Sequence, residues 1–326
     1  MLRIVFHGDN AACFAPGFAD LIPSGASIAT LPDLLTTAEQ QAAYAKADVI
    51  VGVQFNESLP QPQNLRLFHV PGAGYDAVKL DLLPKDAVVC NCFGHDPAIA
   101  EYVFAGMLSR HVPLADADAK LRGGNWAYWS GSNDRLHGEI SGKTVGLLGF
   151  GHIGQAIARR AKAFDMRVIV GNRSPVAPSD LLDQSFTLDA LDEFWAGSDF
   201  IVVSLPLTPS TKGIVDAAAF GKMRPGAVIF NVGRGPTIDE TALYEALRSG
   251  QIDGGVIDTW YTYPSADDAN PKPSRLPFHE LSNLVMTPHM SGWTAGTVRR
   301  RQETIAANVR HLLGGTPGIN VVRNKL

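Results

Sequence analysis

The sequence predicts an α/β protein built from two parallel-sheet domains, and three observations lead to this prediction. Short apolar segments alternate with segments whose apolar residues recur at helical spacing, as in strand–helix units. The chain has 326 residues, which is more than a single hydrophobic core usually holds. One apolar segment, residues 144–148, runs into a glycine-rich turn that opens onto a helical pattern, a junction typical of doubly wound sheets.

The composition is that of an ordinary globular protein, with 45% hydrophobic and 18% charged residues and a net charge of −4. This balance does not indicate a nucleic acid or an anionic membrane as partner. Residues 1–8 are expected to form a strand rather than a signal peptide, and no apolar stretch has membrane-spanning length, so we expect a soluble protein. Cys13, Cys90 and Cys92 are an odd number, and the last two are too close for a usual metal or redox pair. We therefore expect three reduced thiols, no metal site and a cytoplasmic location.

The part of the chain ahead of the glycine-rich turn is expected to form a small parallel α/β unit, with a helix at residues 36–46. Its strands are expected at residues 2–6, 48–53, 65–70 and 87–90. The segment Pro71-Gly-Ala-Gly-Tyr-Asp76 follows the third strand, where open α/β sheets place their ligands. Backbone N–H groups around Ala73 and Gly74 would suit a carboxylate. A flexible turn without a ligand explains these residues almost equally well.

A single long helix is expected over residues 98–122. Asp96 and Pro97 are typical of a helix start, and Gly123 and Gly124 of a helix end. A helix of this length between two α/β patterns is suited to bridge two domains. The aromatic cluster at residues 125–129 is more typical of packing or of a subunit interface than of ligand contact.

The glycine-rich turn carries the pattern Gly-x-Gly-x-x-Gly at Gly149, Gly151 and Gly154, and includes His152 and Ile153. Gly149 would permit the tight turn, Gly151 the approach of a pyrophosphate, and Gly154 close packing of the helix on its strand. The pyrophosphate would lie at the helix N-terminus, where free N–H groups and the helix dipole favour an anion. Because a strand precedes the turn and a helix follows it, the sequence predicts a Rossmann dinucleotide-binding domain.

Five further strands are expected to complete this domain as a doubly wound sheet. They are expected at residues 167–170, 200–204, 227–230, 255–258 and 284–286. Residues 262–277, rich in Pro, Asp and Ser, are expected to form an ordered loop. A last helix at about residues 294–313 and a strand at residues 320–323 are expected to return to the first domain.

Asn172, Arg173 and Ser174 are expected to select the cofactor. A site that prefers NAD usually ends its second strand with Asp or Glu, which binds the ribose hydroxyls and repels a 2′-phosphate. Asn172 stands there without a charge, and Arg173 and Ser174 offer a guanidinium and a hydroxyl to a phosphate. The sequence therefore favours NADP(H). If Arg173 points to solvent instead, NAD(H) would be accepted by default.

Four further motifs follow in order. They are Leu205-Pro-Leu-Thr-Pro-Ser-Thr-Lys-Gly213, residues 223–235 with Asn231-Val-Gly-Arg-Gly235, Ile257-Asp-Thr-Trp260 and Met286-Thr-Pro-His289. Together they resemble the D-2-hydroxyacid dehydrogenase family, and the resemblance extends from Gly72 to the C-terminal helix. It implies that a Rossmann domain of residues 98–294 is inserted into a flavodoxin-like catalytic domain of residues 1–97 and 295–326. It also implies a homodimer built on the nucleotide domain, and an active site in a cleft that closes over cofactor and substrate.

Arg234 corresponds to the substrate arginine of that family and His289 to its acid/base. Hydride transfer to a ketone builds negative charge on oxygen, which a guanidinium stabilises while it also pairs with the substrate carboxylate. An imidazole can donate the proton in reduction and accept it in oxidation. Without the resemblance, a capping or surface arginine and a buried structural histidine would explain these residues. The resemblance also assigns substrate binding to Ala73 and Gly74, and cofactor binding to Leu205, Pro206, Thr211, Val232, Gly233, Asp258 and Gly292.

The sequence departs from the family at Tyr263, where the family usually has a glutamate that pairs with the catalytic histidine. A phenol ionises near pH 10, so it would not stabilise a charged histidine as a carboxylate does. Glu280, Asp267 or Asp268 could supply a carboxylate instead. Formate dehydrogenases, a branch of the family, also lack this glutamate, although the segment before Ala100-Glu101 does not match their pattern.

Three functions follow from these observations. The leading one is an NAD(P)-dependent reductase of small 2-keto acids such as glyoxylate, hydroxypyruvate or phenylpyruvate. A formate-type dehydrogenase is the second. The third is a nucleotide-sensing binding protein, because transcriptional corepressors exist that resemble these dehydrogenases.

Overall fold

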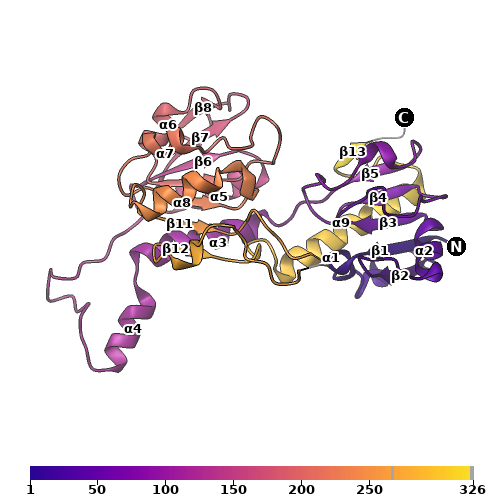
Figure 1. Ribbon diagram of the computed structural model, residues 1–326, viewed down its shortest axis with the longest axis horizontal. Coiled ribbons are helices and arrows are strands. Elements are labelled where there is room, and N and C mark those ends of the chain that lie inside the picture. The colour runs from indigo at the N-terminus through magenta and orange to yellow at the C-terminus, as the bar shows by residue number, and fades with distance from the viewer. Residues whose placement is uncertain (266–267, 324–326) are drawn as a thin grey trace. The chain divides into compact units, whose positions relative to one another are not determined.

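The computed structural model of the protein describes residues 1–265 and 268–323, and the chain forms two compact units (Figure 1). Unit 1 comprises Met1–His95 and the segment that begins at Trp293, and unit 2 comprises Asp96–Gly292. Each unit has its own sheet with helices on both faces. Both sheets are parallel apart from one edge strand, which confirms the predicted α/β fold class.

The sheet of unit 1 has the strand order β13-β5-β4-β3-β1-β2, with β13 antiparallel to β5. Alternate strand residues face opposite sides: Phe6 packs with Ile305 of helix α9, whereas Val5 packs with Tyr44 of helix α2. The strands are β1 (Arg3–His7), β2 (Ser27–Leu31), β3 (Val49–Gly52), β4 (Leu67–His69), β5 (Val88–Cys90) and β13 (Val321–Arg323). The helices are α1 (Asp9–Ala12), α2 (Ala38–Ala45) and α9 (Ala295–Gly314), with 3-10 turns at Phe18–Leu21 and Leu80–Leu82.

Local sequence explains where α2 and α9 begin and where α9 ends. Thr37 and Gln40 form a reciprocal capping box at the start of α2. The hydroxyl of Thr294 accepts a hydrogen bond from the N–H of Thr297 at the start of α9, and Gly315, at φ 65°, ends this helix in the left-handed conformation. The helix predicted at residues 294–313 and the strand predicted at residues 320–323 are thus confirmed.

The sheet of unit 2 has the strand order β12-β11-β10-β9-β6-β7-β8 and is parallel throughout its described pairs. One face packs on α3 and α5 and the other on α6, α7 and α8, so the sheet is doubly wound as predicted. The strands are β6 (Thr144–Leu148), β7 (Arg167–Asn172), β8 (Gln184–Thr187), β9 (Phe200–Val203), β10 (Val228–Asn231), β11 (Gly254–Ile257) and β12 (Leu284–Met286). The helices are α3 (Asp96–His111), α4 (Leu114–Arg122), α5 (His152–Ala163), α6 (Asp192–Gly197), α7 (Ala217–Lys222) and α8 (Glu240–Arg248), with 3-10 turns at Gly235–Thr237 and Phe278–Glu280.

The single helix predicted over residues 98–122 is wrong, because the chain forms two helices there. Helix α3 ends at His111 and α4 begins at Leu114, with Pro113 between them. Proline lacks the N–H that an uninterrupted helix needs, and its ring disfavours helical backbone at the preceding residue. None of the residues of α4 is buried, and Figure 1 shows α4 standing away from the sheet of unit 2. We call residues 112–143, which leave α3 and return to β6, the arm.

Two edge strands, β2 and β8, were not predicted from the sequence. Leu31 is the one buried residue of β2, and no residue of β8 is fully buried. Edge strands such as these have few buried side chains, so they lack the continuous apolar run of the central strands. In the described part of the chain, none of the helices is long and apolar enough to cross a membrane.

Candidate active site

The glycine-rich turn joins β6 to α5 in the geometry that each glycine was expected to allow. Gly149 has φ 103°, a left-handed conformation that favours glycine. A Cβ at Gly154 would collide with the carbonyl oxygen of Gly149, so the helix packs directly on the turn. A Cβ at Gly151 would meet no protein atom within 4 Å, which leaves open space in front of the helix N-terminus at His152 and Ile153. The turn therefore fits the close approach of a pyrophosphate to backbone N–H groups.

The end of β7 presents Asn172, Arg173 and Ser174. The side-chain amide of Asn172 donates to the carbonyl oxygen of Ser174 at 3.0 Å, which closes the turn. Arg173 and Ser174 are exposed. The side chain of Arg173 is thus reachable by a phosphate, and no carboxylate stands at the strand end.

The segments after β9 and β10 lie close together at the carboxyl edge of the same sheet. Thr211 Oγ1 donates to the carbonyl oxygen of Pro206 at 2.6 Å, and Val232 N donates to Val203 O at 3.1 Å. A Cβ at Gly233 would lie 2.7 Å from the carbonyl oxygen of Leu205, so the position has no room for a side chain. Parallel strands end at one edge, and this edge is where doubly wound sheets bind their ligands.

Asn231 and Thr237 fix the loop that carries Arg234. The amide oxygen of Asn231 accepts from Gly233 N and its amide nitrogen donates to Arg234 O, both at 3.1 Å. Thr237 Oγ1 donates to the same carbonyl at 2.6 Å, and the Arg234 guanidinium donates to Gly233 O at 2.9 Å. Sequence reasoning did not single out Asn231 or Thr237. The available signal was a polar residue at the end of an apolar strand, directly before a glycine.

A buried carboxylate, that of Asp258, organises the loop that carries His289. Its Oδ1 accepts from Thr287 Oγ1 at 2.6 Å and from Met290 N at 2.8 Å, and its Oδ2 accepts from Ser291 N at 3.0 Å. Asp258 is fully buried, so these bonds are strong and the ends of the loop are well fixed. Asp258 was expected to bind cofactor, and in the structure its carboxylate holds the loop that leads to Gly292.

Two aromatic side chains hold Thr287 from the other side. Tyr102 of α3 lies with its hydroxyl 2.7 Å from Thr287 Oγ1, and since that hydroxyl donates to Asp258, Tyr102 is the donor to Thr287. Trp260 Nε1 donates to Thr287 O at 2.8 Å. Sequence reasoning did not assign a role to Tyr102 or Thr287. His289 itself is exposed and has φ 59°, a left-handed conformation uncommon for histidine.

Tyr263, which stands where the family usually has a glutamate, contacts Nδ1 of His289. Its hydroxyl oxygen lies 3.0 Å from His289 Nδ1 and accepts from the backbone N–H of Trp260 at 3.1 Å. Burial raises the pKa of Tyr263, so the phenol keeps its proton at neutral pH. The network then directs the phenol proton to Nδ1 and leaves the proton of the neutral imidazole on Nε2. Tyr263 is therefore a neutral donor to the histidine and not a counter-ion.

Three carboxylates could have paired with His289 in place of the glutamate, and the structure gives contacts for two of them. Asp268 Oδ1 accepts from Asn270 N at 3.0 Å. Glu280 lies 3.9 Å from His279 Nε2. Asp267 lies outside the described residues. Among the described residues, His, Cys, Asp and Glu side chains form no group of three suited to a metal ion.

In unit 1, Asn91 and Cys92 hold the loop that contains Ala73 and Gly74. Asn91 Nδ2 donates to Ala73 O at 2.7 Å, and Cys92 N donates to Gly72 O at 3.1 Å. In a trans peptide the N–H points opposite to the preceding C=O, so the N–H groups of Ala73 and Gly74 point away from Asn91 and Cys92. Asn91 was not identified from the sequence. Its side chain orients the N–H of Gly74, and the backbone N–H of Cys92 orients that of Ala73, so both point to the side where a carboxylate could bind.

The chain is similar to proteins of one family. Residues 104–291 match the family described as D-isomer specific 2-hydroxyacid dehydrogenase, NAD binding domain. A D-3-phosphoglycerate dehydrogenase of Mycobacterium leprae (strain TN) is 36% identical over 261 residues, which are 79% of this chain and 47% of that protein. A hydroxypyruvate reductase of Thermotoga maritima is 35% identical over 241 residues, which are 73% of this chain and 74% of that protein.

A solved structure shows the same fold over nearly the whole chain. It is a D-isomer specific 2-hydroxyacid dehydrogenase from Xanthobacter autotrophicus Py2 in complex with NADPH and MES, with a TM-score of 0.77 and 26% identity over 98% of this chain and 97% of that chain. The chain spans about half the length of the phosphoglycerate dehydrogenase that it matches. Because the family match covers more than half of the chain, this protein belongs to the D-isomer specific 2-hydroxyacid dehydrogenase family.

Proposed function

We propose that this protein reduces small 2-keto acids to 2-hydroxy acids, reversibly, with a nicotinamide cofactor. The observation that carries the proposal is the placement of two loops at the carboxyl ends of β10 and β12, two strands of the same parallel sheet with β11 between them. One follows β10 and holds Arg234, and the other follows β12 and holds His289 with its Nδ1 against Tyr263. Family membership and the similarity to a hydroxypyruvate reductase support the reaction class.

When bound, the reduced cofactor supplies a hydride to the carbonyl carbon of the substrate. The doubly protonated form of His289 supplies the proton that the carbonyl oxygen takes up, and Nε2 is the donating atom because Nδ1 lies against the hydroxyl of Tyr263. After the transfer the histidine is neutral and keeps the proton on Nδ1, which donates to the phenol oxygen. Arg234 stabilises the negative charge that grows on that oxygen and binds the carboxylate beside it. In unit 1, Ala73 and Gly74 offer backbone N–H groups suited to a substrate carboxylate.

The proposed binding residues also assign a role to each of the two units. Unit 2 binds the cofactor at the glycine-rich turn and at the ends of its central strands, and unit 1 supplies substrate contacts. The predicted domains, residues 98–294 and residues 1–97 with 295–326, remain the proposed division of labour. A cytoplasmic location also remains a prediction, and it rests on cysteines that form no disulfide among the described residues.

The test of this function measures loss of reduced nicotinamide absorbance with glyoxylate, hydroxypyruvate and phenylpyruvate, and gain of it with formate and oxidised cofactor. Turnover of one or more 2-keto acids is expected. Arg234→Ala and His289→Ala are each expected to lower kcat/KM by roughly 10²–10³-fold, because each removes a group that acts in the transition state. Arg248→Ala, on the exposed end of α8, is the matched control and should match the wild type.

Turnover of formate alone would replace the proposal with the formate-type reaction. Nucleotide binding without turnover of any of these substrates would favour a nucleotide-sensing binding protein. Wild-type rates in Arg234→Ala or His289→Ala would contradict the role of that residue.

For the cofactor we propose a preference for NADP(H). The support is the exposed Arg173 and Ser174 beside an uncharged Asn172, together with the NADPH bound in the Xanthobacter relative. The variant Asn172→Asp/Arg173→Ala is expected to shift the kcat/KM ratio of NADPH to NADH toward NADH by roughly 10–100-fold, because a charged hydrogen bond is lost and a carboxylate opposes the phosphate. Arg159→Ala, an exposed arginine on α5, should leave the ratio unchanged. A wild type that prefers NADH would refute the proposed preference.

A further inference from the structure

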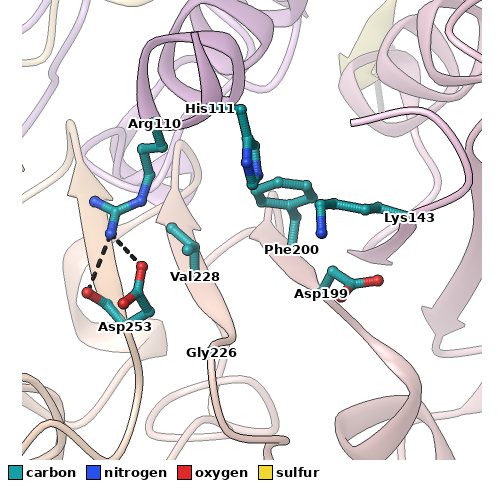
Figure 2. Close-up of a pocket in the computed structure, with 8 residues that line it drawn as sticks. All are labelled: Arg110, His111, Lys143, Asp199, Phe200, Gly226, Val228 and Asp253. Carbon is teal, nitrogen blue, oxygen red and sulfur yellow. Dashed lines mark hydrogen bonds and ion pairs between the residues drawn. The ribbon is translucent and has the colours of Figure 1, made fainter. Parts of the chain in front are cut away.

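A small cavity lies at the amino-terminal edge of the sheet of unit 2. Its volume is about 60 Å³, enough for roughly two water molecules or one small ion. Figure 2 shows the residues that line it, which are Arg110, His111, Lys143, Asp199, Phe200, Gly226, Val228 and Asp253. Lys143 directly precedes β6, Phe200 begins β9, Val228 begins β10 and Asp253 directly precedes β11. In a parallel sheet these strand starts lie at the edge opposite to the strand ends that carry the candidate active site.

The two carboxylates at the cavity already have partners. Asp253 pairs with Arg110 at 2.6 Å, as Figure 2 shows. Asp199 accepts from Thr144 N at 2.8 Å and pairs with Arg224 at 2.5 Å. Within the described residues, Lys143 forms no ion pair. The lining thus holds two cations and two carboxylates, and of these four groups Lys143 is the one without an ion pair to a described residue, because Asp199 pairs with Arg224 from outside the lining.

His111 is the titratable group at the centre of this charge distribution. Its ring packs edge-on against the ring of Phe200, with the centroids 5.6 Å apart. Burial and then the nearby charges of Lys143 and Arg110 lower the pKa of His111, while Asp199 and Asp253 oppose the change. Lys143 and Arg110 therefore act on the imidazole in the same direction as burial, and the two carboxylates act against them.

We propose that this cavity binds a small inorganic oxyanion, of the size of sulfate or phosphate, through Lys143 and His111. A basic pair at the end of α3 has a simpler explanation, since cations interact favourably with a helix C-terminus. That explanation accounts for Arg110 and His111. It does not account for Lys143, which comes from the strand side and shares the cavity with them.

The position of the site gives it a structural consequence. His111 ends α3 where the arm leaves, and Lys143 is the last residue of the arm before β6. An anion held by both residues ties the two ends of the arm together and stabilises unit 2 by RT ln(1 + c/Kd), where c is the concentration of the free anion. Protonation of His111 adds a second unpaired positive charge, so binding strengthens as the pH falls.

The test titrates sodium sulfate into the full-length protein by calorimetry at constant ionic strength, with sodium chloride as the balancing salt. Sulfate keeps its charge between pH 6 and 8, so any pH dependence reports on the protein. The wild type is expected to bind sulfate in the millimolar range or tighter, with higher affinity at pH 6 than at pH 8. Lys143→Gln is expected to weaken binding at least about tenfold, because a charge-assisted hydrogen bond is removed.

Two further variants separate a binding site from a structural role. His111→Gln is expected to retain binding at pH 8 and to lose the gain at pH 6. Lys222→Gln, which removes a lysine on α7 outside the cavity, should bind like the wild type. Equal sulfate affinity in the wild type, Lys143→Gln and Lys222→Gln would overturn the proposal, as would the absence of binding in the wild type. The outcome is independent of the proposed reaction, because no residue of this cavity belongs to the candidate active site.

Discussion

At the scale of single residues, Tyr263 gives His289, the proposed acid/base, a different partner from the one that the family resemblance implies. A glutamate would stabilise the charged imidazolium, whereas a neutral phenol stabilises the neutral imidazole by donating to Nδ1. The backbone N–H of Trp260 donates to the phenol oxygen, which leaves the phenol proton for Nδ1 of the neutral imidazole. The residue therefore positions His289 and fixes its tautomer without adding charge.

We expect Tyr263→Glu to extend ketoacid reduction to higher pH, because a carboxylate keeps the histidine protonated. Tyr263→Phe removes the donor, and kcat should fall by roughly 3–10-fold, which corresponds to one hydrogen bond. The measurement is the pH dependence of kcat/KM for all three proteins under conditions where the chemical step limits the rate. Superimposable profiles for the wild type and Tyr263→Glu would argue against a role for Tyr263 at His289.

The sequence alone singled out Tyr263 and His289, because both are placed by the spacing of the family motifs. Asn231 and Thr287 were not singled out, since each acts through hydrogen bonds to neighbouring backbone or to a buried carboxylate. Such roles depend on distances that spacing along the chain does not encode. A polar residue at a strand end is a weak signal, because turns contain such residues without any functional reason.

At the scale of secondary-structure elements, the contact of β4 with α9 makes unit 1 sensitive to acid. His69 on β4 is fully buried, with Nδ1 3.0 Å from Val70 O and Nε2 2.9 Å from Asn308 Nδ2 on α9. Burial lowers the pKa of His69 from 6.5 to about 4. Below pH 6.5 the unfolded chain binds a proton that the folded protein does not, so stability falls as the pH drops toward 4.

His69→Gln should remove this contribution while its amide oxygen still accepts from Asn308. From the two pKa values, the histidine alone destabilises the folded protein by about 2 kcal/mol at pH 5 relative to pH 7. We expect the loss of unfolding free energy between these pH values, measured with urea, to be smaller in His69→Gln by about that amount. His279→Gln, on an exposed histidine, is the control and should behave like the wild type. An unchanged loss in His69→Gln would show that His69 titrates normally.

Most of the strands that the sequence predicted correctly are buried on both faces, such as β3, β6 and β10, whereas the predicted edge strands β12 and β13 have no buried residue. The side chains of the buried strands are apolar without interruption, so the pattern is strong. The edge strands β2 and β8 mix polar and apolar residues and gave no such pattern. The predicted helix was too long because the apolar pattern continues past Pro113, whereas the proline itself interrupts the helix.

At the scale of the whole molecule, the arm exposes large apolar side chains that are suited to bind another protein chain. Trp126 and Trp129 are 67% and 60% exposed, and Leu114 and Leu121 of α4 are 75% and 50% exposed. Large apolar side chains gathered on one projecting segment are typical of association surfaces. The homodimer implied by the family resemblance is therefore proposed to form through the arm of unit 2.

Trp126→Ser/Trp129→Ser is expected to raise the dimer dissociation constant by roughly 30-fold or more, because even one tryptophan buried at an interface typically contributes about 2 kcal/mol. Sedimentation velocity across a concentration series measures the change. Leu313→Ser, which replaces an apolar residue of α9 that is 46% exposed, is the matched control and should leave the assembly unchanged. Both tryptophans are exposed, so the double variant should keep the circular dichroism of the wild type. A variant that sediments as the wild type does would place the subunit contact elsewhere, and a monomeric wild type would exclude the dimer.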